Sequence, residues 1–133
     1  MSGLRTYFRR LPLSLALCAA PICAQAETMP PSDPLRTFAT CAGRLSAQME
    51  FEWMFDGAAS EVTQDRRGEV LDILDAMTPP TQVRDVLNWR IEAKMAHSSL
   101  LQRTTFSDDS RIQMQARRLS VQKLKSCTAL LLG

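Results

Sequence analysis

The sequence predicts an all-α protein: a small up-down-up-down four-helix bundle closed by one disulfide and preceded by a cleaved signal peptide. Apolar residues recur at steps of three and four along four segments, which is the period of an amphipathic helix. Short connections separate these segments, and short connections favour antiparallel neighbours. The two cysteines that follow the leader lie in the first and the last segment, where one bridge can join them.

The first 26 residues form the predicted signal peptide. Three arginines (Arg5, Arg9 and Arg10) precede an apolar stretch at 11–24, and Ala24-Gln25-Ala26 supplies the small residues that a signal peptidase requires. The apolar stretch is shorter than the roughly 20 residues of a membrane span. We therefore expect cleavage near Ala26, a periplasmic or secreted protein, and no stable membrane insertion afterwards. We favour the general secretory route over the twin-arginine route.

Loss of the leader changes the charge of the protein. The whole chain has 16 Lys and Arg against 14 Asp and Glu. Because three arginines and no acid lie in the leader, the mature chain is close to neutral. The basic character belongs to the export signal, so composition gives no support to nucleic-acid binding.

The cysteines are expected to form one disulfide. Cys18 and Cys23 leave with the leader, whereas Cys41 and Cys127 remain as an even pair in an exported protein. A bridge between them closes a loop of nearly the whole domain, which is worth about 4 kcal/mol in the chain-entropy model.

The mature chain divides into a flexible, proline-rich tether at 27–34 and a single helical domain at 35–133. Turn and cap chemistry marks three connections inside the domain, at Asp56-Gly57, at Thr78-Pro79-Pro80 and at 107–110. Ser60 is a candidate cap for the second helix. The four expected helices cover 35–55, 60–77, 81–106 and 110–131.

The first expected helix ends in an unusually apolar run, MEFEWMFDG at 49–57. Met49 and Trp53 continue the core stripe, whereas Phe51, Met54 and Phe55 project to other sides of the helix. A contiguous apolar patch off the core marks a partner surface, which makes these three residues the partner-binding candidates. Burial against a second helix is the alternative. The full core stripe is Leu35, Phe38, Ala42, Leu45, Met49 and Trp53.

The third expected helix has two apolar stripes, which indicates that other helices surround it. The first stripe is Val83, Leu87, Ile91, Met95 and Leu101, and the second is Val86, Trp89, Ala93, Ala96 and Leu100.

If the first and last helices lie side by side at the level of Cys41 and Cys127, Glu50 and Glu52 fall near the level of Ala116, Arg117 and Arg118. The segment 111–125 holds five cations and no acid, and 61–75 holds five acids against two arginines. Either these complementary charges determine which helices are neighbours, or the basic face binds an anionic partner.

A small-ligand or haem carrier is the alternative function, with its site between the first and third helices. Arg90, Lys94 and His97 lie along one line of the third helix, near Trp89 and Trp53. His97 is the only histidine and the haem attachment motif C-x-x-C-H is missing. We therefore expect no cofactor and no metal site.

No arrangement typical of catalysis is recognisable, and Glu50 and Glu52 point in different directions on a helix. We expect an exported, non-enzymatic binding or accessory protein that acts through its apolar helical surface, in the manner of a chaperone or an inhibitor. The expected partner is an unidentified envelope protein.

Overall fold

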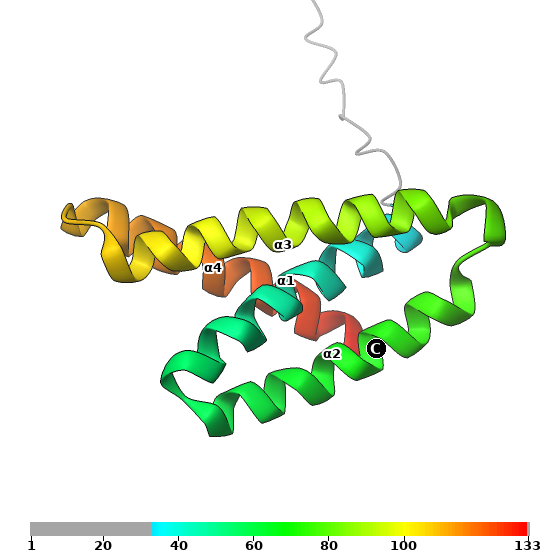
Figure 1. The fold of residues 1–133 in the computed structure, drawn as a ribbon, viewed down its shortest axis with the longest axis horizontal. Helices are drawn as coiled ribbons and strands as arrows, with labels where there is room; N and C mark the ends of the chain where they lie inside the picture. Colours follow the sequence, from blue (N-terminus) through cyan, green and yellow to red (C-terminus); the bar gives the residue numbers. More distant parts are fainter. Residues whose placement is uncertain (1–32, 133) are drawn as a thin grey trace, which may run out of the picture.

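A computed structural model describes residues 33–132, which form four α-helices joined by short turns (Figure 1). No strand occurs in that part of the chain, so the predicted all-α class is confirmed. The signal peptide and residues 27–32 of the tether lie outside the described residues. The helices are α1 (Pro34–Phe55), α2 (Gly57–Met77), α3 (Val83–Phe106) and α4 (Ser110–Thr128), with single 3-10 turns η1 (Pro80–Gln82) and η2 (Ala129–Leu131).

Aspartates cap three of the four helices. The Asp33 carboxylate accepts a hydrogen bond from Leu35 N (3.0 Å), and Pro34 occupies the first turn, where its missing N–H costs nothing. Asp109 caps α4 in the same way. Asp56 accepts from Ala59 N (3.1 Å), so α2 begins at Gly57. The expectation that Ser60 caps α2 is therefore wrong.

The central helix of the fold is α1. Consecutive helices reverse direction, α1 lies between α2 and α3, and α4 crosses α1 (Figure 1). The prediction that the third helix is surrounded is wrong, because α2 and α3 pack on different sides of α1. All four helices contribute to the core, which consists of Leu35, Ala39, Cys41, Ala42, Leu45, Val70, Leu74, Val86 and Cys127.

Small side chains in the middle of α1 allow this arrangement. Ala39 and Ala42 are fully buried, and Gly43 is buried against α3. A Cβ atom on Gly43 would overlap the carbonyl oxygen of Arg90 and would lie 3.0 Å from Lys94 N. The backbones of α1 and α3 are therefore in direct contact at Gly43.

The first apolar stripe of α3 is largely outside the core. Val83, Leu87, Ile91 and Met95 are 50–66% exposed, and of this stripe only Leu101 is buried. In the second stripe Val86 is buried, and Trp89 packs against the core. The face of α3 that the second stripe occupies covers α1, which leaves the first stripe without a helix over it.

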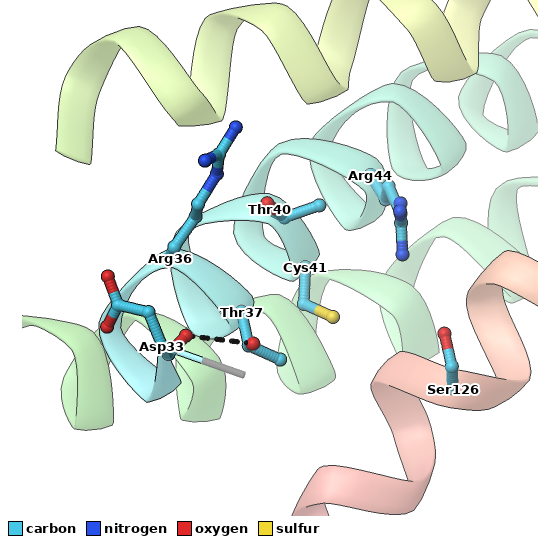
Figure 2. A pocket seen from close by; sticks show the side chains of 7 residues that line it. All are labelled: Asp33, Arg36, Thr37, Thr40, Cys41, Arg44 and Ser126. Carbon is cyan, nitrogen blue, oxygen red and sulfur yellow. Dashed lines mark hydrogen bonds between the residues drawn. The ribbon is translucent and has the colours of Figure 1, made fainter. Parts of the chain in front are cut away.

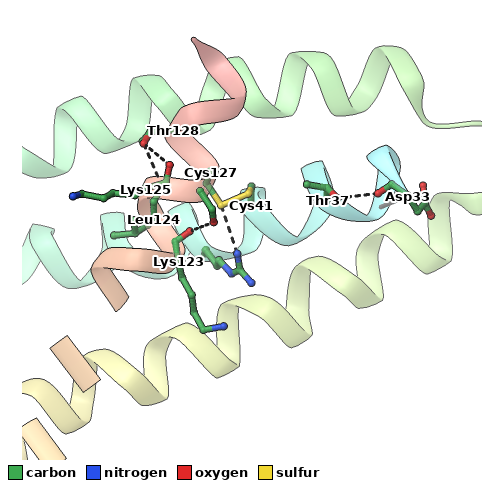
Figure 3. The surroundings of a disulfide bond; sticks show 10 residues. Asp33, Thr37, Cys41, Lys123, Leu124, Lys125, Cys127 and Thr128 are labelled. Carbon is green, nitrogen blue, oxygen red and sulfur yellow. Dashed lines mark hydrogen bonds between the residues drawn. A yellow bond between two sulfur atoms is a disulfide. The ribbon is translucent and has the colours of Figure 1, made fainter. Parts of the chain in front are cut away.

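The Cys41–Cys127 disulfide is present and joins α1 to the end of α4, with the two Cα atoms 5.3 Å apart (Figure 3). Because α4 crosses α1, the expected side-by-side register is wrong. Glu50 pairs with Lys94 of α3 (2.6 Å), and Glu52 accepts a hydrogen bond from Thr63 of α2 (2.6 Å). Neither glutamate is bonded to α4.

Replacing Gly43 by alanine is expected to lower the free energy of unfolding by about 1–3 kcal/mol, because the added methyl group must separate two helix backbones. Gly68→Ala is the matched control, since a Cβ there meets nothing within 4 Å. That change should raise stability by about 0.5–1 kcal/mol through helix propensity. Urea denaturation followed by circular dichroism measures both. Equal effects of the two substitutions would show that the α1–α3 contact is looser than described.

Candidate partner-binding site at the end of α1

Large apolar side chains are exposed at the C-terminal end of α1. Trp53 is 78% exposed, Met54 67% and Phe55 61%. Phe51 is partly buried, and its ring lies against that of Phe55, with 4.9 Å between centroids. We refer to these four residues as the tip patch. The prediction that Trp53 lies in the core is wrong, because α1 diverges from α3 toward this end (Figure 1).

The tip patch borders a shallow hollow of about 380 Å³ between α1 and α3. Leu101, which is buried, contributes an apolar surface to it, and Gln102 and Ser98 provide polar groups on the α3 side. The hollow is large enough to receive one apolar side chain of a partner. Its α1 side is formed by Ala47, Glu50, Phe51, Trp53 and Met54.

Polar contacts hold the end of α1 in place beneath the patch. Glu52 accepts hydrogen bonds from Gln48 (2.7 Å) and from Thr63 of α2 (2.6 Å). Asp56 ends α1 through its backbone N–H, which donates to the Glu52 carbonyl (2.6 Å), and the same residue caps α2. The tip patch is thus attached to a helix end with several fixed partners.

The residues of the alternative ligand site do not share one cavity. Arg90 and Lys94 line a groove of about 180 Å³ together with Arg67 of α2, whereas Trp53 borders the hollow at the tip. Trp89 lies under the guanidinium of Arg36, whose Cζ is 5.5 Å from the centre of the indole ring. The structure therefore brings together only Arg90 and Lys94 of the predicted set. Whether they bind a ligand stays a prediction.

His97, the remaining member of that set, is buried with 1% of its surface exposed. Its Nε2 atom lies 3.4 Å from Oε1 of Gln48, and Nδ1 has no partner within the described residues. Burial lowers the His97 pKa to about 4, and the positive charges of Arg44 and Lys123 act in the same direction. At neutral pH His97 is therefore an uncharged core residue.

A second hollow, of about 380 Å³, lies beside the disulfide (Figure 2). Its polar groups are engaged locally: Thr37 donates to the Asp33 carbonyl (2.9 Å), Arg44 donates to the sulfur of Cys127 (3.8 Å), and Arg36 covers Trp89. These groups do not converge on a common point. We therefore assign no ligand to this hollow.

Comparison with protein-family models, with curated proteins and with solved structures found no match to this chain. Between residues 33 and 132, no helix has both the length and the apolar character of a membrane span. The same residues contain no group of three His, Cys, Asp or Glu side chains arranged to hold a metal.

The sequence predicts Phe51, Met54 and Phe55 of the tip patch, but it places Trp53 in the core and gives no sign of the contribution of α3. Leu101 was predicted to face the core, and nothing in its spacing places it at the base of the hollow near Trp53. Ser98 and Gln102 carry no signal of their own. Only the packing of α3 along α1, which the sequence does not show, brings residues 98–102 to the hollow beside the tip.

The tip patch is expected to contribute little to stability. Trp53→Ser and Phe55→Ser should each change the free energy of unfolding by less than about 1 kcal/mol, because both side chains are mostly in water. Leu74→Ala is the contrasting variant, since Leu74 is fully buried, and should cost about 2–5 kcal/mol. A cost of several kcal/mol for either tip variant in urea denaturation would place that ring in the core.

Stability should depend on pH through His97. The pKa of His97 is about 4 in the folded protein and 6.5 for an ordinary histidine. As the pH falls, the unfolded chain therefore binds a proton at His97 before the folded chain does. Stability is complete above about pH 7 and decreases by about 2 kcal/mol between about pH 7 and pH 5. His97→Gln, which does not titrate, should remove this part of the dependence. Parallel urea titrations test this, and an unchanged pH slope in the variant would contradict it.

Proposed function

We propose that this chain is an exported, non-enzymatic binding protein whose tip patch docks on another protein of the cell envelope. The observation that carries the proposal is the exposure of Trp53, Met54 and Phe55 at one helix end, with the aromatic ring of Phe51 beside them. A protein gains nothing in stability by leaving large rings in water, so a contiguous patch of this kind points to a surface that is covered in a complex.

The residue types of the patch suit a binding surface. Tryptophan and phenylalanine bury large areas at low entropic cost and dominate the energy of many interfaces. Methionine is flexible and polarisable, so Met54 can adapt to the shape of a partner. The neighbouring hollow offers a receptor for one apolar side chain, with polar groups of Ser98 and Gln102 at its edge. A reciprocal contact follows: rings of the tip enter the partner, and one partner side chain enters the hollow.

Export and the compartment belong to the same proposal. The leader at 1–26 motivates them, and the disulfide supports them, because such bridges form and persist in oxidising compartments. The small-ligand or haem carrier is the weaker proposal, since Trp53, Trp89 and His97 lie in different surroundings.

Affinity capture from a periplasmic extract tests the docking role. The exported protein serves as bait beside a variant that combines Trp53→Ser with Phe55→Ser, and captured proteins are identified by mass spectrometry. We expect the intact protein to capture a partner. The variant should capture at least about tenfold less of that partner, because it lacks two exposed anchor residues.

The control bait carries Val83→Ser. Val83 is an apolar residue with 56% exposure at the start of α3, at the other end of the molecule from the tip. This bait should capture the same partner as the intact protein. Equal capture by all three baits would refute the role of the tip patch. A Soret absorbance band in the purified protein would instead support the haem carrier.

A further inference from the structure

The outward side of α2 is strongly acidic. Five acids follow one another along the helix between residues 61 and 75, and all five are exposed. They extend over about 21 Å, given a rise of 1.5 Å per residue. Two apolar residues flank them, Val62 and Ile73, which are 50% and 40% exposed. The acids are Glu61, Asp65, Glu69, Asp72 and Asp75.

The outward side of α4 has the opposite charge. Arg111, Arg118 and Lys125 are exposed and lie seven residues apart, so they form a line of cations on one side of the helix. This line also extends over about 21 Å. Beside it lie Met114 and Val121, 54% and 47% exposed. The two helix faces thus match in length and carry charges of opposite sign, and exposed apolar residues flank each of them.

These faces do not neutralise each other within the chain. The ion pairs within residues 33–132 are Lys94–Glu50 and a 4.0 Å contact between Arg111 and its own cap, Asp109. The interpretation that the opposite charges determine which helices are neighbours is therefore wrong. The side of α4 that faces α1 and α3 is the side opposite the cations. It carries the three buried residues Ala116, Ser120 and Cys127.

We propose that the acidic face of α2 packs against the basic face of α4 in a second copy of this chain. Under a twofold axis this contact occurs twice, because α4 of each copy meets α2 of the other. The paired charges select this partner and its direction, and the four apolar residues between them lose water on contact. An unrelated anionic partner would satisfy α4 alone and would leave the complementary face of α2 unexplained.

Sedimentation velocity of the exported, disulfide-bonded protein tests the proposal. We expect a dimer at low salt that dissociates when NaCl is raised from about 0.1 M to about 1 M, because the Debye length then falls from about 10 Å to about 3 Å. A monomer at low salt and about 100 µM protein overturns the proposal, since charge attraction is then at its strongest.

Charge reversal identifies the faces. One variant carries Asp65→Lys, Glu69→Lys and Asp72→Lys, which make the five-residue face of α2 net positive. The other carries Arg118→Glu with Lys125→Glu, which make the line on α4 net negative. Each alone should weaken the dimer by more than about tenfold, because both contacts of the pair then oppose like charges. An equal mixture of the two should form a heterodimer, since every reversed face now meets a face of opposite sign.

Control variants test whether the effect is specific to the two charged faces. Glu92→Lys reverses an exposed charge on α3, a helix that carries neither face, and should leave the dimer unchanged. Circular dichroism checks that each variant is helical. If a reversal variant does not fold, Asp65→Asn with Asp72→Asn replaces it and should weaken the dimer less. Reversal variants that remain as dimeric as the intact protein, or a mixture that stays monomeric, overturn the assignment of these faces.

Discussion

The direct backbone contact between α1 and α3 at Gly43 is the constraint on which the other helix positions depend. A helix that presents glycine and alanine over its middle turns is thin, and neighbours can approach it closely from several sides. Once α3 lies against this surface, α2 takes another side of α1, and α4 reaches α1 where Cys41 meets Cys127. The result is a fold organised around one central helix, in which two sequence neighbours, α2 and α3, are separated by a third.

The thin central helix also explains why so much apolar surface remains outside. Ala39 and Ala42 offer little area for larger residues to cover, so Leu87, Ile91 and Met95 have no room in the core and lie on the flank of α3. A core of this composition gains less from burial than one built from leucine. The disulfide offsets part of that deficit by restricting the unfolded chain, at about 4 kcal/mol in the entropy model. A small core and an exposed apolar flank on α3 thus go together in this fold.

Helix identity, most helix ends and the disulfide could be predicted from the sequence, because each depends on local chemistry or on a count of cysteines; the start of α2 at Gly57 is the exception. The misplaced residues share one cause. Periodicity shows on which side of a helix Trp53 or Leu87 lies, but it does not show whether another helix covers that side. The small residues around Gly43 indicate that the first helix is central. A prediction based only on the large apolar residues does not detect this. The charges of α2 and α4 are ambiguous for a related reason, since complementarity in one sequence does not distinguish contacts within a chain from contacts with a partner.

The single residue Asp56 separates α1 from α2, and it serves both as the end of the first helix and as the cap of the second. A connection this short has almost no freedom to rearrange, so Trp53, Met54 and Phe55 are presented on a stiff hairpin instead of a loop. In the docking proposed for the tip patch, association would order side-chain rotamers and leave the backbone as it was, which would keep the entropic cost of complex formation low. A stiff presenting surface also favours partners of one shape over partners of many.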